Sequence, residues 1–131
     1  MSGLSIFDIS GGGMRSQMMR LNSTASNIAN AGTISGSEAS AYRTIKPVFR
    51  TVEDGQGNAT VEVVSFERNR SPPIRRQDPN HPLADAEGYV WEADVDTAIE
   101  LVEMIEASRQ FQNNVNVLET GKMLINETIR T

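Results

Sequence analysis

The chain has 131 residues, of which 22% are charged, 38% hydrophobic and 5% aromatic, and its formal net charge is −5. This length fits one domain, or one small domain with long helical arms. The acidic balance argues against nucleic acid as a partner, because phosphate binding needs a positive surface. The sequence contains no cysteine, which excludes disulfides, thiolate zinc sites and cysteine nucleophiles.

Targeting and membrane patterns are also missing from the sequence. No stretch approaches the roughly 20 consecutive apolar residues that a membrane-spanning helix needs. The first residues do not combine a basic segment with an apolar one, which is the pattern of a cleavable secretory signal. We therefore expect no direct membrane span, and either a cytosolic protein or export by a route that does not use such a signal.

The chain divides into three zones, which we expect to be an N-terminal helix in 1–31, a β-hairpin and loop region in 32–93, and a C-terminal helix in 94–131. Both ends have helical periodicity, whereas the middle contains all five prolines. Residues 1–30 hold two arginines and one aspartate, and residues 94–131 hold seven acidic and three basic residues. These opposite net charges favour pairing of the two ends, within one subunit or between neighbours.

The N-terminal zone begins with a capping box, in which Ser5 and Asp8 each satisfy a backbone group at the start of a helix. Small and apolar residues then recur at alternating spacings of three and four, the pattern of a heptad seam. We expect its large apolar members to form a subunit interface: Phe7, Met14, Met18, Leu21 and Ile28. The glycine triplet at 11–13 opposes the helix, since each glycine costs about 1 kcal/mol relative to alanine. The continuity of this helix therefore stays open.

The C-terminal zone has the same pattern over a longer range, and we expect a helix over about 97–129. Thr97 and Glu100 have the spacing of a second capping box. The expected interface residues are those of the apolar stripe: Leu101, Met104, Ile105, Phe111, Val115, Leu118, Ile125 and Ile129.

The middle zone has the pattern of extended structure. Residues 42–53 and 60–68 read as two strands joined by a turn-rich connector, and residues 88–92 as a third strand. Residues 32–41 and 71–82 are expected to be loops, the second stiffened by prolines. The sequence therefore predicts an α+β fold in which long N- and C-terminal helices form one coiled-coil-like arm domain, with a small β-rich central insertion.

Apolar stripes on long helices must be buried, and the central zone is too small and too polar to cover both helices. Two interpretations remain open at this point. One is an assembly subunit whose helices are covered by neighbouring molecules. The other is a monomeric helical domain with a β-hairpin insertion.

Several motifs resemble those of the flagellar rod and hook protein family. The N-terminal signature lies in Ile6–Gly11, in Arg20–Asn22 and in Ala25–Ala31. The stretches His81–Val90 and Asp94–Asp96 are similar to the proximal-rod branch of the family, and Glu103–Val115 resembles the family's C-terminal helix. The resemblance covers nearly the whole chain.

The resemblance implies a structural subunit of the basal-body proximal rod in the periplasm, which polymerises helically and transmits torque. It also implies export by the flagellar type III apparatus, and contacts with copies of itself and with other rod proteins (FlgB, FlgF and FliE). It implies no cofactor. A soluble helical binding module or an export chaperone is the alternative.

Candidate chemical sites are few. His81, the sole histidine, has only Asp78 and Asp85 as nearby ligand types, so we expect no metal site. Neither a nucleotide-binding glycine motif nor a Ser/His/Asp set is present, so we expect no enzyme. Asn27 and Asn30, near the end of the first helix, are expected to form turns and hydrogen bonds, within the subunit or between subunits.

Overall fold

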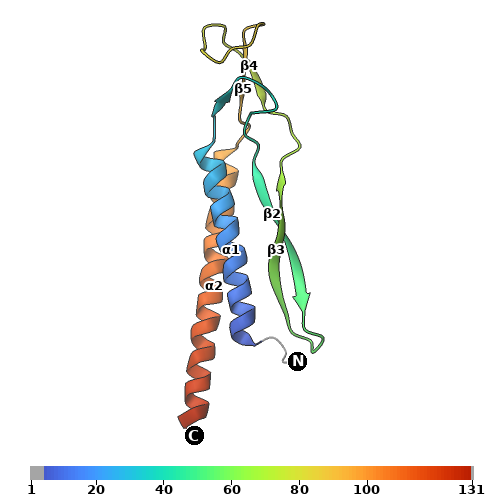
Figure 1. Cartoon of the computed structure of the whole chain (residues 1–131). Coiled ribbons are helices and arrows are strands. Elements are labelled where there is room, and N and C mark those ends of the chain that lie inside the picture. The colour runs from blue at the N-terminus through green and yellow to red at the C-terminus, as the bar shows by residue number, and fades with distance from the viewer. Residues whose placement is uncertain (1–4, 131) are drawn as a thin grey trace.

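The computed structural model describes residues 5–130 and consists of two long helices, a long hairpin and a small sheet (Figure 1). This arrangement confirms the predicted α+β class. The elements in chain order are α1 (Ile6–Ala29), β1 (Ile34–Ser35), β2 (Ile45–Glu53), β3 (Ala59–Arg68), β4 (Ile74–Gln77), β5 (Tyr89–Glu92) and α2 (Thr97–Arg130).

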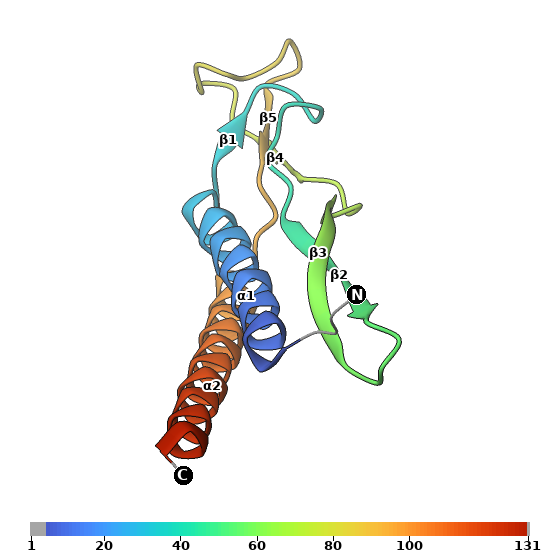
Figure 2. The ribbon, with the colours of Figure 1, turned by 60° about the horizontal axis from the view of Figure 1, so that its bottom comes forward.

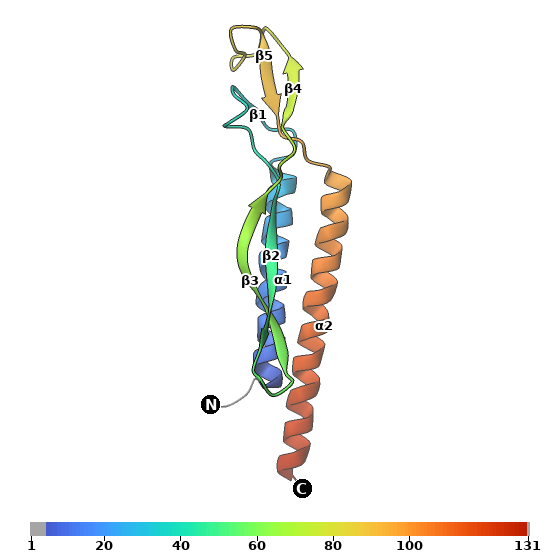
Figure 3. The same ribbon diagram turned by 90° about the vertical axis from the view of Figure 1, so that its right-hand side faces the viewer.

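The two helices lie side by side and antiparallel, with the small sheet beyond one end of the pair (Figures 1 and 3). Close approaches between α1 and α2 are separated by seven or fourteen residues along each helix. Ile6 lies against Gly121, Gly13 against Asn114, and Asn27 against Glu100. Since α1 begins at Ile6, the last nine residues of α2, 122–130, run past the start of α1 for about 13 Å.

The start of α1 has the predicted capping box. The Ser5 hydroxyl accepts a hydrogen bond from the Asp8 N–H, and the Asp8 carboxylate accepts bonds from the Ser5 N–H at 3.0 Å and hydroxyl at 2.9 Å. These hydrogen bonds, that from the backbone first, hold the pKa of Asp8 below its ordinary value.

The glycine triplet lies inside α1, and the helix is continuous through it. Gly12 faces the hairpin, where a Cβ would clash with Thr60 Oγ1 and lie 3.1 Å from the Val61 carbonyl oxygen. Gly13 faces α2, where a Cβ would lie 2.5 Å from Asn114 Oδ1. The low helix propensity of these residues is therefore offset by close packing that any side chain would block.

The start of α2 differs from the prediction. Asp96 caps the helix, because its Oδ1 accepts hydrogen bonds from the N–H groups of Ala98 (3.0 Å) and Ile99 (3.3 Å). The capping box expected at Thr97 and Glu100 is wrong, since Glu100 turns instead toward α1 and bonds Asn27. Asp is preferred to Thr as an N-cap, so the cap at Asp96 agrees with local propensity, and the spacing of Thr97 and Glu100 alone was misleading.

The β2–β3 hairpin pairs Ile45 with Arg68 at its base and Glu53 with Ala59 at its turn. The turn needs Gly55 and Gly57, whose φ angles of 79° and 90° favour glycine. The hairpin runs along α1 (Figures 1 and 2). It is held there by hydrogen bonds from Thr60 Oγ1 to the Ile9 carbonyl (3.0 Å) and from Ser16 Oγ to the Val61 carbonyl (3.3 Å).

The small sheet has the order β1-β5-β4. The predicted third strand is β5, but β1 and β4 lie in stretches that were expected to be loops. Both are short edge strands in polar sequence, and only their pairing with β5 makes them strands. The Arg75 guanidinium of β4 lies 3.7 Å from the ring centre of Tyr89 and 5.8 Å from that of Trp91 on β5.

The apolar core within the described residues is small. Its fully or nearly buried members are Ala41, Val90, Ala93 and Ala107. Only Val90 among them is larger than alanine, so one chain by itself buries few large apolar side chains. Within residues 5–130, neither helix has a stretch apolar enough to span a membrane.

Candidate assembly surface

The apolar stripes predicted from the sequence lie on the outside of the single chain or only half inside it. The exposed residues are Phe7, Met18, Leu101, Ile105, Ile125 and Ile129. The half-buried residues are Met14, Leu21, Ile28, Met104, Phe111, Val115 and Leu118. None of these thirteen side chains is buried within the chain, although burial of apolar area is the main force that stabilises such helices.

Apart from Val117, the large exposed apolar residues of α2 gather near its two ends. Near the start they are Ile99, Leu101, Val102 and Ile105, and near the end they are Met123, Leu124, Ile125 and Ile129. At each end they point in several directions around the helix. Polar residues lie between them, so at each end they form a broad apolar surface that this chain leaves uncovered.

The seam between α1 and α2 is built from residues that lie outside the predicted apolar stripes. The buried residues of α2 are Glu100, Ala107 and Gly121. With Asn114, which faces Gly13, they recur every seven residues. The sequence contains this seam as a heptad of small and polar residues, which lies outside the predicted apolar stripes.

Polar contacts complete this seam. Arg20 of α1 pairs with Glu103 of α2, and its Nη2 lies 2.7 Å from Glu103 Oε2. Both side chains are partly exposed, so the pair contributes to orientation more than to stability.

Asn27 joins three elements. Its Nδ2 donates to the Ile45 carbonyl and to Glu100 Oε2, both at 3.0 Å, and its Oδ1 accepts from the Ile45 N–H (3.0 Å) and the Tyr42 hydroxyl (2.6 Å). The side chain is completely buried, and every hydrogen bond that an asparagine can make is made within the chain. Asn30 is half-buried at the end of α1, where its Nδ2 donates to the Ser26 carbonyl.

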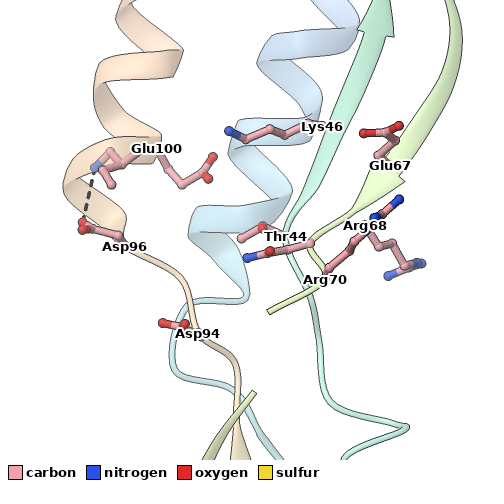
Figure 4. A pocket seen from close by; sticks show the side chains of 10 residues that line it. Thr44, Lys46, Glu67, Arg68, Arg70, Asp94, Asp96 and Glu100 are labelled. Carbon is pink, nitrogen blue, oxygen red and sulfur yellow. Dashed lines mark hydrogen bonds between the residues drawn. The ribbon is translucent and has the colours of Figure 1, made fainter. Parts of the chain in front are cut away.

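A groove of about 730 Å³ opens between the start of α2 and the base of the hairpin (Figure 4). Asp94 and Asp96 lie on the α2 side, and Lys46, Arg68 and Arg70 on the hairpin side (Figure 4). Within the described chain no ion pair joins the two sides of the groove. Ile99, which is exposed, also lines it.

In the loop that contains His81, backbone N–H groups donate hydrogen bonds to the side chains of His81 and Asp85. His81 Nδ1 accepts from the Leu83 N–H, and Asp85 Oδ1 accepts from the N–H groups of Glu87 and Tyr89. Across residues 5–130, histidine and acidic side chains nowhere form a group of three that could hold a metal ion.

Comparison of the sequence with known protein families indicates the class of protein to which this chain is similar. The profile of the family described as "Flagellar basal body rod FlgEFG protein C-terminal" matches residues 86–131, which include β5 and α2. Over these residues the chain is thus similar to the rod proteins of the flagellar basal body.

The individual relatives narrow this class. The flagellar basal-body rod protein FlgC of Yersinia enterocolitica is 42% identical over 130 residues, covering 98% of this chain and 97% of the relative. FlgC of Salmonella typhimurium is 39% identical over 127 residues, covering 96% and 95%. FlgC of Aquifex aeolicus is 33% identical over 122 residues, covering 92% and 90%. The chain belongs to the FlgC family, and it is a structural subunit of the basal-body rod rather than an enzyme.

Proposed function

We propose that this rod subunit polymerises helically in the proximal rod, in the periplasm, through the apolar surfaces of α1 and α2. The observation that carries the proposal is the exposure of the predicted stripes, with Ile105 59% and Ile129 76% exposed in the single chain. Apolar area of this kind is covered when subunits associate. In the assembled rod we expect the two helices to act as one coiled-coil-like arm domain, with residues 32–93 as an insertion.

Torque transmission follows from such packing. Close-packed side chains are poorly compressible, so a rod whose subunits interdigitate resists shear between them. We propose that the neighbours are further copies of this chain and the rod proteins FlgB, FlgF and FliE, and that the flagellar type III apparatus exports the subunit. Met14, Met18 and Met104 support contact with non-identical neighbours, because the unbranched methionine side chain adapts to irregular surfaces.

The interface is tested by charge substitution at exposed positions. Ile105→Asp places a charge in the proposed interface but leaves the single chain intact, because Ile105 is exposed. Ile105→Val, which keeps an apolar side chain at the same position, is the matched control. We expect Ile105→Asp to remove the subunit from isolated basal bodies and to abolish motility, while Ile105→Val assembles normally. Normal incorporation of Ile105→Asp contradicts the proposal.

A further inference from the structure

The groove at the start of α2 has two charged sides that do not pair with each other. Within residues 5–130, Asp94 makes no ion pair, and neither do Lys46, Glu67, Arg68 and Arg70 on the hairpin side, although all five line the same groove. Opposite charges held apart in this way suit an occupant that carries charges of both signs. The exposed side chain of Ile99 adds an apolar contact to the groove.

The far end of α2 has the complementary chemistry. Its last nine residues, 122–130, run past the start of α1, and Leu124 and Ile129 are exposed there. The segment also carries Lys122, Glu127 and Arg130, none of which forms an ion pair in the described chain. It therefore offers charges of both signs together with uncovered apolar area.

We infer that the C-terminal end of α2 of one copy docks in the groove at the start of α2 of a second copy. Arg130 then faces the Asp94 side, Glu127 faces Arg68 and Arg70, and Ile129 packs on Ile99. The negative C-terminal end of one helix dipole also approaches the positive N-terminal end of the next, which is favourable. This inference rests on the proposed function and specifies which surfaces meet.

Such a contact joins two different patches that lie at opposite ends of one helix. A contact between unlike patches is heterologous, and it generates an open-ended filament unless the rotation between copies closes a ring. A contact of this kind permits growth in one direction, which a rod requires.

Cysteine pairing tests the contact directly, because the natural chain has no cysteine. Ile99 and Ile129 lie 30 positions apart on one helix, about 45 Å. A disulfide needs Cα atoms within about 7 Å, so any disulfide in the Ile99→Cys/Ile129→Cys variant joins two molecules. We expect this variant to give a ladder of disulfide-linked oligomers in isolated basal bodies and in concentrated purified protein. Neither single variant should form a ladder.

Two comparisons make the result specific. Gln112→Cys/Ile129→Cys, with the first cysteine at an exposed site outside the groove, should stay unlinked. In the Ile99→Cys/Ile129→Cys background, Arg130→Glu should lower the yield of oligomers at least several-fold, and adding Asp94→Lys should restore it, because the two sites then carry opposite charges again.

The possible failures are distinguishable. If the protein is present in basal bodies but the ladder is missing, or if Ile129→Cys links only to a different rod protein, docking between copies is overturned and the proposed function stands. An equally strong ladder from the Gln112→Cys variant also overturns the docking. If the natural chain is missing from basal bodies, the proposed function itself is wrong.

Discussion

At the scale of single residues, Asn27 is the position where one side chain decides how three elements meet. Its amide bonds β2 through Ile45, α2 through Glu100 and the preceding loop through Tyr42. The sequence predicted hydrogen bonding at Asn27, but could not say with what. Its partners are 15, 18 and 73 positions away in the chain, so no local pattern names them.

Replacing Asn27 with alanine should destabilise the protein more than the same change at Asn30. Asn27→Ala leaves the buried Glu100 carboxylate and the Ile45 backbone groups without partners, a loss of about 3 kcal/mol. Asn30→Ala removes one half-buried bond to the Ser26 carbonyl, a loss of about 1 kcal/mol. Urea unfolding at one fixed protein concentration measures both free energies. Equal losses for the two variants would contradict the role given to Asn27.

At the scale of elements, the helices pair through small residues while their large apolar residues face outward or lie half-buried. Heptad spacing in the sequence located the helices, and both form over nearly the expected ranges. The spacing did not predict which face of each helix packs against the other helix. That contact is made by small residues, among them Gly13, Ala107 and Gly121, and not by the large apolar ones. Propensity also argued against a continuous α1, and tertiary packing of the hairpin overrides it.

The packing of α1 against the hairpin gives a matched pair of glycine substitutions. Gly12→Ala should destabilise the fold by about 1–3 kcal/mol, because the new methyl group meets Thr60 and the Val61 backbone. Gly11→Ala should stabilise it by up to about 1 kcal/mol, since its methyl group meets only the far end of Arg15. Thermal unfolding at one protein concentration compares them. If Gly11→Ala is also destabilising, strain within the helix explains the glycine triplet at 11–13, and the contact between Gly12 and the hairpin does not.

At the scale of the whole molecule, the single chain has an extended shape with a small apolar core (Figure 1). The burial that stabilises most domains of this length is lacking inside the described chain, and its largest fully buried side chains are Val90, Asn27, Ser10 and Ser16. In the proposed assembly neighbouring subunits supply that burial, so folding and assembly should be thermodynamically linked.

This linkage predicts that the stability of the natural chain depends on its concentration. The far-ultraviolet circular dichroism signal for helix and the melting temperature should both rise with protein concentration, by several degrees over a hundredfold range. Ile129→Asp should weaken this dependence, because it places a charge on the exposed end of α2. Full helicity and an unchanged melting temperature in dilute solution would argue for a self-sufficient monomer.

The sequence by itself determined the helix positions, the first cap, the hairpin and β5, because these depend on local spacing and turn residues. Its motifs also determined the family, which the relatives then established over nearly the whole chain. Only the tertiary structure decided the contact of Glu100 with Asn27, the edge strands β1 and β4, and the seam of small residues. Each of these depends on a partner distant in sequence, and local periodicity contains no record of which distant residue that partner is.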